Sequence, residues 1–300
     1  MRKIAAVIVT YNRKDLLKEC IESILKQKAY IPDIIVVDND SRDGTRDALA
    51  SFVDAGQVYY YNTGTNLGGA GGFQFGIRKG VELGYKYLWI MDDDCMPENM
   101  ALSALLSSAK RHPDFGFLSS KVLWPDGNIC RMNVQRESLI KNVKDFDRKL
   151  IPVVMASFVS LFIKTDTVKE IGLPIKEFFI WTDDWEFTRR ISMKYPCYLV
   201  TESQVVHKSK MNITADVSSD TVDRLDRFRY LYRNDVYLYR REGLRGFTYE
   251  CIRLSFHCLR VLLKSKDHKW QRIKKIIGGT MEGLHFHPEI EHVRNYRGIE

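Results

Sequence analysis

Three consecutive aspartates, Asp92, Asp93 and Asp94, directly follow the hydrophobic run 87–91. In an extended chain, side chains two positions apart point to the same side, so Asp92 and Asp94 can converge while Asp93 faces away. Two convergent carboxylates suit a hard divalent cation such as Mg²⁺ or Mn²⁺, and such a cation offsets the charge of a diphosphate. The alternative is a solvated acidic turn, or acids that cap a helix after Pro97.

A second acidic cluster lies much further along the chain, where Asp183, Asp184 and Glu186 stand beside Trp181 and Trp185. A carboxylate that aromatic rings shield from water is suited to act as a general base on a sugar hydroxyl. The alternative is structural, because acidic side chains in the first turn of a helix interact favourably with its dipole. The residues alone leave both interpretations open.

Two further features are weaker evidence of a binding site when each is taken alone. Residues 66–73 read Asn-Leu-Gly-Gly-Ala-Gly-Gly-Phe, a glycine-rich loop that leads into a helix and lets the backbone approach a phosphate closely. This segment is neither a P-loop nor a dinucleotide fingerprint, and a flexible connector is the alternative. His207 closes the strand-like run 197–206 and is a candidate metal ligand, although a lone histidine is more often structural.

The elements that must position these residues alternate between strand and helix over the first hundred residues. Short apolar runs are expected as strands, and segments with apolar residues three and four apart as helices. The expected strands are Ile4–Thr10, 34–38, 57–61 and 87–91, and the expected helices are 14–27, 45–52, 73–83 and a segment after Pro97. This order predicts an α/β fold with a mostly parallel sheet flanked by helices, in which ligands bind beyond the carboxyl ends of the strands.

The periodicity is less regular from residue 115 to residue 206. The charged segment 131–149 is interpreted as a surface excursion, and the segment 153–163 as a buried strand. Beyond residue 209 the chain becomes helical, basic and rich in aromatic residues. We therefore predict a first domain over residues 1–215, which carries the acidic motifs, and a C-terminal helical, basic region over residues 216–300.

Composition and length limit the class of protein. The 300 residues include 45% hydrophobic and 28% charged side chains, as in ordinary globular proteins. The longest uncharged apolar stretch, 151–163, is too short to span a bilayer, which takes about 20 residues. No secretory signal is visible. The six cysteines form no C-x-x-C pair, so a zinc site is not expected. The sequence predicts a soluble or peripheral protein of the cytoplasm.

The net charge of +8 is concentrated near the C-terminus, where residues 221–275 contain 15 Lys and Arg against 6 Asp and Glu. Residues 244–264 fit one amphipathic helix. Its basic stripe consists of Arg253, His257, Arg260 and Lys264, and its opposite side of Phe247, Cys251, Cys258, Leu259 and Leu262. The basic stripe is expected to contact an anionic membrane surface. Alternatively, the helix packs on the rest of the protein and leaves this stripe in water.

Taken together, these motifs resemble the family-2 glycosyltransferases, which have the GT-A fold. Residues 9–13 (Val-Thr-Tyr-Asn-Arg) and 37–41 (Val-Asp-Asn-Asp-Ser) are similar to the nucleotide-binding start of that family. The aspartate triplet matches its metal-binding motif, and Asp183-Asp184 its late acidic pair. Several motifs in the expected order over residues 3–210 are much more specific than any one of them alone.

Within this family, the sequence is most similar to bacterial galactofuranosyltransferases. The likeness rests on the glycine-rich segment 66–73, the unsplit aspartate triplet, the Trp-x-Asp-Asp-x-Glu motif of residues 181–186 and the later His207. The polymerising members of that group are much longer and have an added N-terminal domain. A single transfer step is therefore expected of this chain.

The resemblance implies an inverting, metal-dependent transfer of galactofuranose from UDP-galactofuranose to a glycan acceptor in bacterial polysaccharide synthesis. It implies a lipid-linked acceptor and a position at the inner face of the cell membrane. Asp184 would be the catalytic base, and Asp92, Asp94 and His207 would hold Mn²⁺ or Mg²⁺. Donor contacts are implied for Thr10, Tyr11, Arg13, Asp38, Asn39, Asn66, Gly68, Gly69, Asp92 and Asp93. Acceptor contacts are implied for Trp181, Asp183, Trp185 and Glu186.

Three other functions compete with this interpretation. A dTDP-rhamnose-dependent rhamnosyltransferase is the alternative inside the same class of enzyme. A nucleic-acid-binding protein would explain the basic C-terminal region, but both acidic clusters would repel phosphate, and no nucleic-acid partner is expected. A nicotinamide-dependent dehydrogenase shares the α/β pattern but would need a glycine fingerprint after the first strand, which is missing.

Overall fold

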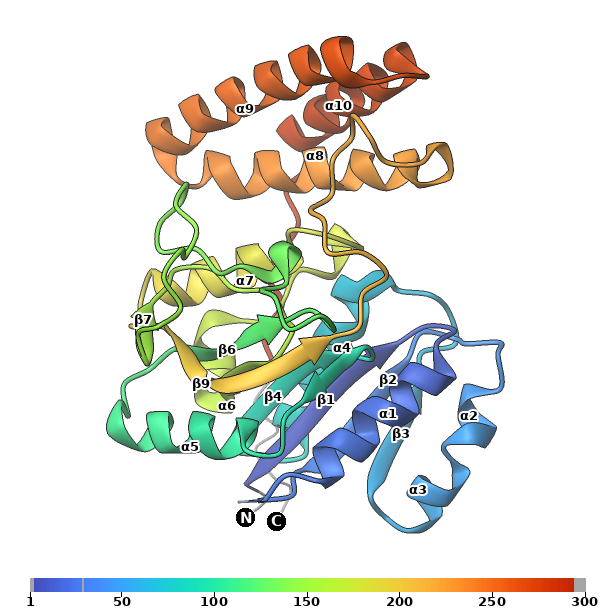
Figure 1. Ribbon diagram of the computed structural model, residues 1–300, viewed down its shortest axis with the longest axis vertical. Helices are drawn as coiled ribbons and strands as arrows, with labels where there is room; N and C mark the ends of the chain where they lie inside the picture. The colour runs from blue at the N-terminus through green and yellow to red at the C-terminus, as the bar shows by residue number, and fades with distance from the viewer. Residues whose placement is uncertain (1–2, 29, 294–300) are drawn as a thin grey trace.

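A twisted β-sheet with helices on both faces forms the centre of the protein, in a computed structural model that describes residues 3–28 and 30–293 (Figure 1). Residues 1, 2, 29 and 294–300, which include the end of the predicted C-terminal region, lie outside the described residues. The described strands are β1 Ile4–Thr10, β2 Asp33–Asp38, β3 Val58–Asn62, β4 Tyr87–Asp92, β5 Cys95–Pro97, β6 Phe117–Leu123, β7 Leu150–Pro152, β8 Leu161–Lys164 and β9 Tyr198–His207. The described α-helices are α1 Lys14–Leu25, α2 Thr45–Ala48, α3 Ala50–Asp54, α4 Gly68–Glu82, α5 Ala101–Arg111, α6 Thr165–Ile171, α7 Asp183–Ser192, α8 Leu225–Arg240, α9 Gly243–Lys264 and α10 Lys269–Leu284.

The first half of the sheet follows the predicted alternation of strand and helix. The strands β3, β2, β1 and β4 lie side by side and pair in parallel. Alternate residues of β1 face opposite sides, so Ile4, Ala6 and Ile8 pack against α1 and α5, whereas Ala5 and Val7 pack against α4. Both faces of the strand are therefore buried, as in α/β proteins.

Parallel register brings the carboxyl ends of three strands to one edge. Thr10 at the end of β1 is opposite Asp38 at the end of β2, and Val9 is opposite Asp92 at the end of β4. Polar side chains that are up to 82 residues apart in the chain therefore become neighbours at this edge. The predicted location of the ligand site, beyond these strand ends, depends on this register.

The glycine-rich segment is part of a helix, which corrects the prediction of a loop followed by a helix from residue 73. Helix α4 begins at Gly68. A Cβ atom at Gly72 would lie 2.5 Å from Val9 Cγ1, and one at Gly76 would lie 2.5 Å from Val7 Cγ1. These glycines let the helix lie directly on β1, and this close packing outweighs the low helix propensity of glycine.

The second half of the sheet is mixed. Strand β8 is antiparallel to β4 and β6, whereas β9 is parallel to β6 and antiparallel to β5. Of the strand predicted over 153–163, only β8 forms, and residues 153–160 are mostly buried but irregular. Segment 131–149 is only partly a surface excursion, because it contains the buried Asn133 and Val143.

The pairing of β5 with β9 places His207 beside the aspartate triplet. Cys95, which follows Asp94 directly, is paired with His207, and the backbone N–H of Lys208 donates to the carbonyl of Asp94 at 2.8 Å. The predicted α/β class is confirmed, and the helical C-terminal region is present as predicted. The proposed division at residue 215 stays a prediction.

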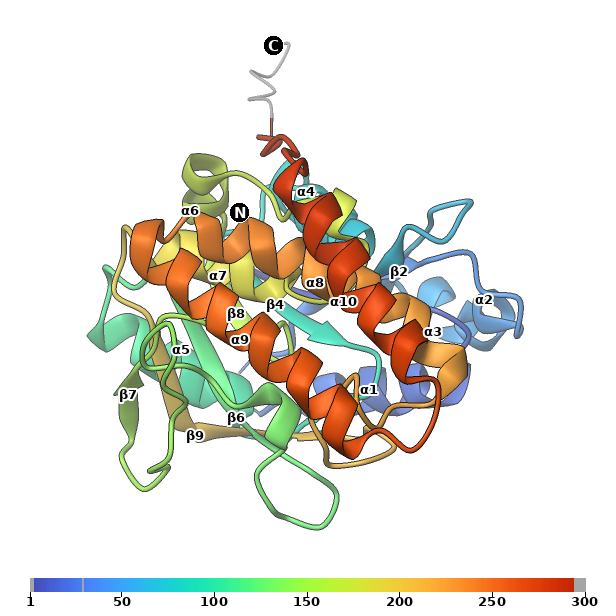
Figure 2. The same ribbon diagram turned by 90° about the horizontal axis from the view of Figure 1, so that it is seen from above.

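The helices α8, α9 and α10 form a layer above the sheet, with α8 nearest to it (Figures 1 and 2). Helix α8 is mostly buried between the sheet region and the other two helices. Among the described residues, no helix combines the length and the apolar character that crossing a membrane requires. All six cysteines are free thiols.

The predicted outward orientation of the basic stripe on α9 is wrong for three of its four residues, whereas Lys264 is exposed as predicted. Arg253 faces the protein, where its guanidinium pairs with Asp235 of α8 at 2.7 Å and with Glu250 at 2.8 Å. Arg260 pairs with Asp216 at 2.9 Å, and the Tyr232 hydroxyl shares a hydrogen bond with Nδ1 of His257 at 2.9 Å. Most of the opposite side is exposed, namely Phe247, Cys251, Leu259 and Leu262.

Candidate active site

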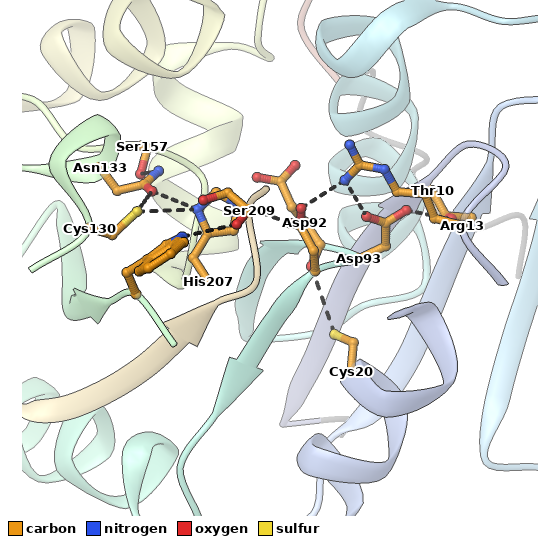
Figure 3. A network of polar contacts seen from close by, with 12 residues as sticks. Thr10, Arg13, Cys20, Asp92, Asp93, Cys130, Asn133, Ser157, His207 and Ser209 are labelled. Carbon is orange, nitrogen blue, oxygen red and sulfur yellow. Dashed lines mark hydrogen bonds and ion pairs between the residues drawn. The ribbon is translucent and has the colours of Figure 1, made fainter. Parts of the chain in front are cut away.

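The aspartate triplet and His207 converge at the carboxyl edge of the sheet. Ligand atoms of Asp92, Asp94 and His207 all lie within 4.8 Å of one another. Asp92 ends β4 (Figure 3), and the pairing of β5 with β9 brings Asp94 and His207 together. Asp92 and Asp94 therefore converge as predicted, but Asp93 does not point fully away, because Nη1 of Arg13 contacts both Asp93 and Asp94.

Asp94 and His207 fit a divalent cation by their hydrogen bonding. Asp94 Oδ1 is buried and lies 3.0 Å from Nε2 of His207, which donates to it when the imidazole is protonated. Nδ1 of His207 lies 2.7 Å from Oδ1 of Asn133, which can only accept, so Nδ1 carries a proton. A buried carboxylate oxygen that faces an imidazole nitrogen is a pair of groups that a metal ion can bridge once the imidazole is neutral.

Asn133 is a residue that the sequence reasoning missed. Its amide nitrogen donates to Ser157 Oγ at 3.0 Å, which fixes the orientation of the amide and leaves the oxygen for His207. Cys130 donates to the same oxygen at 3.1 Å (Figure 3). Asn133 lies in the segment that was interpreted as a surface excursion, Cys130 directly precedes that segment, and Ser157 lies in the irregular segment 153–160, so no motif pointed to them.

Asp93 faces the other side, toward the end of β1. Thr10 Oγ1 donates to Asp93 at 2.7 Å, and Nη1 of Arg13 donates to Asp93 at 3.2 Å and to Asp94 at 2.8 Å. The Arg13 side chain is 49% exposed, so one side of its guanidinium faces solvent. Arg13 thus supplies positive charge beside the acidic cluster, in contact with both Asp93 and Asp94.

The proximity of three carboxylates perturbs their protonation. Burial, followed by the charge of Asp94, raises the pKa of Asp92 to about 7, and burial raises that of Asp93 to about 6 although Arg13 opposes it. Contacts with His207 and Arg13 outweigh burial at Asp94 and lower its pKa. Burial opposes protonation of His207, but Asp94, Cys130 and Asp92 outweigh it and raise its pKa to about 10. The cluster therefore favours an additional positive charge.

The other predicted donor residues lie around the same edge. Asp38 is buried and accepts hydrogen bonds from Tyr60 at 2.5 Å and from the N–H of Ser41 at 2.8 Å. Asn39 donates to the carbonyl of Gly68 at 3.0 Å, and its own oxygen has no partner. Asn66 and Tyr11 are exposed, and the side chain of Asn66 accepts a hydrogen bond from the N–H of Gly68. The space beside Gly69 is open, because a Cβ atom there would meet nothing within 4 Å.

The late acidic pair begins helix α7. Asp184 Oδ1 accepts from the N–H of Trp185 at 2.7 Å. Burial, followed by the charge of Asp183, raises the pKa of Asp184 well above its usual range, and Asp92 contributes to this shift. Burial also raises the pKa of Asp183 to about 7. Asp184 and Asp92 therefore lie within electrostatic reach of each other.

The aromatic neighbours of this pair are half-buried. Trp181 packs against Phe228 of α8 with ring centroids 5.1 Å apart, and the guanidinium of Arg136 lies 3.7 Å above the ring of Trp185. Glu186 is 3% exposed and forms a two-point ion pair with Arg190, at 2.8 and 2.9 Å. Its carboxylate is therefore engaged within α7, and the expected contact of Glu186 with an acceptor stays a prediction.

Helix α8 supports the loop that precedes Asp183 and Asp184. Nδ2 of Asn234, which is fully buried, lies 2.9–3.1 Å from the carbonyl oxygens of Phe178, Ile180 and Trp181. Thr182, which directly precedes α7, donates a hydrogen bond from its hydroxyl to Asp235 of α8 at 2.6 Å. The loop needs this support because Phe179, Trp181 and Thr182 all have positive φ angles, between 63° and 67°.

Comparison with known proteins identifies the class to which this fold and site belong. Residues 5–172 match the model of glycosyl transferase family 2. The chain therefore belongs to that family and is a glycosyltransferase.

The relatives and solved structures agree with this class. The chain is 27% identical to galactofuranosyltransferase GlfT1 of Mycolicibacterium smegmatis, with 91% of this chain and 95% of that protein covered. It superposes on Staphylococcus aureus TarS in complex with UDP with a TM-score of 0.55, at 14% identity, covering 95% of this chain and 72% of that one. It superposes on GalNAc-T7 with UDP, GalNAc and Mn²⁺ with a TM-score of 0.58, at 16% identity, covering 85% and 55%. Both structures share the GT-A fold with this protein.

Proposed function

We propose that this protein is an inverting, metal-dependent galactofuranosyltransferase that uses UDP-galactofuranose. The observation that carries the proposal is the convergence of Asp92, Asp94 and His207 within 4.8 Å, with Asp184 close enough to be perturbed by Asp92. The choice of sugar is supported by the likeness to the galactofuranosyltransferase of Mycolicibacterium smegmatis over nearly the full length of both chains.

Donor binding is proposed at the carboxyl edge of the sheet. Thr10, Asp38 and Asn39 lie at the ends of β1 and β2, where they can hold the nucleoside. Tyr11, Asn66 and Asp93 can do so from the surrounding loops and turns, and Gly68 and Gly69 from the start of α4. Asp92, Asp94 and His207 would hold Mn²⁺ or Mg²⁺, which supplies Lewis-acid stabilisation of the departing diphosphate. Arg13 adds a second positive charge on the side of Asp93.

Asp184 is proposed as the general base. Its raised pKa suits a group that must accept a proton, and its carboxylate is held by a backbone N–H. The acceptor hydroxyl gives its proton to Asp184 as its oxygen forms a bond to the anomeric carbon. The bond from that carbon to the diphosphate breaks on the opposite face, and UDP leaves with the electron pair. The sugar is inverted because attack and departure occur on opposite faces. Trp181, Asp183 and Trp185 are proposed to contact the acceptor.

The acceptor is proposed to be a lipid-linked glycan of bacterial polysaccharide synthesis, met at the inner face of the cell membrane. The C-terminal residues 216–300 are proposed as the part that meets the membrane, and residues 1–215 as the catalytic part. An exposed apolar surface on the C-terminal helices supports this position. A nucleic-acid partner finds no support. Arg253 and Arg260 belong to the basic excess of residues 221–275, but both pair with acidic side chains of the protein itself.

The experiment is a comparison of nucleotide sugars with the purified protein and Mn²⁺ or Mg²⁺, scored by nucleotide release that depends on an acceptor. UDP-galactofuranose should give the fastest release, chelation should stop it, and the product linkage should have the opposite anomeric configuration to the donor. Faster release from dTDP-rhamnose would favour the rhamnosyltransferase alternative. Full activity after chelation, or a retained configuration, would contradict the mechanism.

A further inference from the structure

The exposed apolar side chains of this protein are concentrated on two helices. Among the described residues, eleven of the twenty exposed large hydrophobic side chains lie between residues 244 and 284, on α9 and on α10. We name this set the docking face. It consists of Leu244, Phe247, Ile252, Phe256, Leu259, Leu262, Leu263, Trp270, Ile277, Met281 and Leu284.

The spacing of these residues places them on the outer side of each helix. On α10, Trp270, Ile277, Met281 and Leu284 recur at helical intervals, whereas Ile273 and Ile276 face α8 and are buried. On α9 the inward side is mixed, because it carries the ion pair of Arg253 with Glu250 and also the buried Val261. Both helices lie above α8, and Figure 2 looks directly down on this outer layer.

Positive side chains surround the docking face. Arg245, Lys264, Lys266, Lys269 and Lys274 are exposed on or between α9 and α10. Within residues 243–285, all of which are described, Asp267 is the single exposed acidic residue. An apolar face with a basic border is complementary to a bilayer that has anionic headgroups, because the apolar side chains enter the interface and the cations bind the headgroups.

We propose that the docking face binds the surface of an anionic lipid bilayer. This inference rests on the proposed function in one respect: a lipid-linked acceptor would explain why the enzyme binds a bilayer. A second copy of the chain fits the face less well, because a two-fold interface would bring the same lysines together. The partner that the charge favours is therefore the bilayer.

The same helices also hold the loop that carries the proposed base. Arg253 of α9 pairs with Asp235 of α8, and Asp235 in turn accepts from Thr182, the residue before Asp183. The docking face and the acidic cluster are thus parts of one connected structure. Binding of the face to a bilayer would hold the site in a defined orientation relative to a lipid-linked acceptor.

The test is co-sedimentation of the full-length protein with phosphatidylcholine vesicles, with and without phosphatidylglycerol. The wild type should bind the anionic vesicles and release them at high salt. The double variant Phe256→Ser, Trp270→Ser should bind at least about tenfold more weakly, because each large apolar side chain contributes strongly to burial. The variant Lys266→Glu, Lys274→Glu should lose binding to the anionic vesicles specifically.

A matched control distinguishes the docking face from apolar exposure in general. Ile31 and Met193 are 56% and 63% exposed and lie outside it, so Ile31→Ser, Met193→Ser should bind like the wild type. All variants should retain nucleotide release with a water-soluble acceptor, which separates failure of docking from failure of the proposed function. A wild type that ignores anionic vesicles overturns the inference. So does a lipid-free dimer that the Phe256→Ser, Trp270→Ser variant dissociates.

Discussion

Asp94 contacts two basic side chains of the site, Arg13 and His207. It is contacted by Nη1 of Arg13 at 2.8 Å and approached by Nε2 of His207 at 3.0 Å. A divalent cation between Asp94 and His207 would compete with the proton that the raised pKa of His207 keeps on the imidazole. Cation affinity should therefore increase with pH, because the imidazole must be neutral to act as a ligand.

Replacement of Asp184 tests the proposed base. Asp184→Asn keeps the shape of the side chain but removes its ability to take a proton, so turnover should fall by about 10²- to 10⁴-fold. UDP affinity should stay within about twofold, because Asp184 is not proposed to contact the nucleotide. The measurement is steady-state nucleotide release together with calorimetric binding of UDP. Asp126→Asn, in an exposed turn, is the control. Unchanged turnover in Asp184→Asn removes the residue from this role.

Asn133 tests the support of the proposed metal site. Asn133→Leu removes the acceptor that orients Nδ1 of His207 at 2.7 Å, so Mn²⁺ affinity should fall by about 10- to 100-fold. Titration of free Mn²⁺ by electron paramagnetic resonance measures this without turnover. Asn128→Leu, which loses only a bond to Asp126 in an exposed turn, should bind Mn²⁺ normally. Equal affinity in the two variants would show that Asn133 does not position His207.

At the scale of elements, sequence patterns predict the type of element better than its packing. The strands β1, β2 and β4 begin and end within one residue of the expected positions, because uninterrupted apolar runs and a following polar turn define them. Helix α4 begins five residues earlier than expected. A glycine run indicates a loop by propensity, and only the proximity of Val7 and Val9 on β1 shows why glycine is needed inside a helix.

The contact of α8 with the base loop is the element-scale feature that can be tested most directly. Asn234→Leu removes the donor to three carbonyl groups, so the loop before Asp183 should shift. Turnover should fall by about 10- to 100-fold, since small displacements of a catalytic group have effects of this size. UDP affinity should change less than turnover, because the loop reaches the proposed donor side through the backbone bond from the N–H of Ala70 to the carbonyl of Phe179, at 3.2 Å. The free energy of unfolding should fall by about 2–4 kcal/mol.

A variant that is destabilised elsewhere separates loss of positioning from loss of stability. Ile276 is 1% exposed and packs between α10 and α8, so Ile276→Ala should cost about 2–5 kcal/mol by leaving a cavity. Its apolar side chain makes no hydrogen bond to the base loop, although Trp181 of that loop packs against the same cluster. At a temperature where both variants are folded, Ile276→Ala should keep wild-type turnover. Similar losses of turnover in both variants would contradict a positioning role for Asn234.

At the scale of the whole molecule, the order of motifs predicted the class of fold and enzyme, but not how the C-terminal helices face the rest. Asp92, Asp94, Asp184 and His207 were recognisable because they end or begin regular elements. The supporting residues Asn133 and Asn234 were not, since their partners are remote and follow no periodicity. The orientation of α9 was predicted wrongly because an amphipathic pattern defines two faces without saying which one meets acidic partners such as Asp235.

The C-terminal helices also give the molecule a predictable acid sensitivity through His257. Burial, followed by the charge of Arg253, lowers the pKa of His257 to about 4, and its Nδ1 shares a hydrogen bond with the Tyr232 hydroxyl. Its unfolded pKa is about 6.5, so between pH 6.5 and 4 the unfolded chain binds a proton that the folded chain does not. The free energy of unfolding should therefore fall with decreasing pH across this window. His257→Gln lacks this group, so from pH 7 to pH 5 it should lose about 1 kcal/mol less than the wild type, allowing for partial exposure. Denaturant unfolding at both pH values measures the difference, and equal losses in the two proteins would show that His257 is not held neutral by the folded helices.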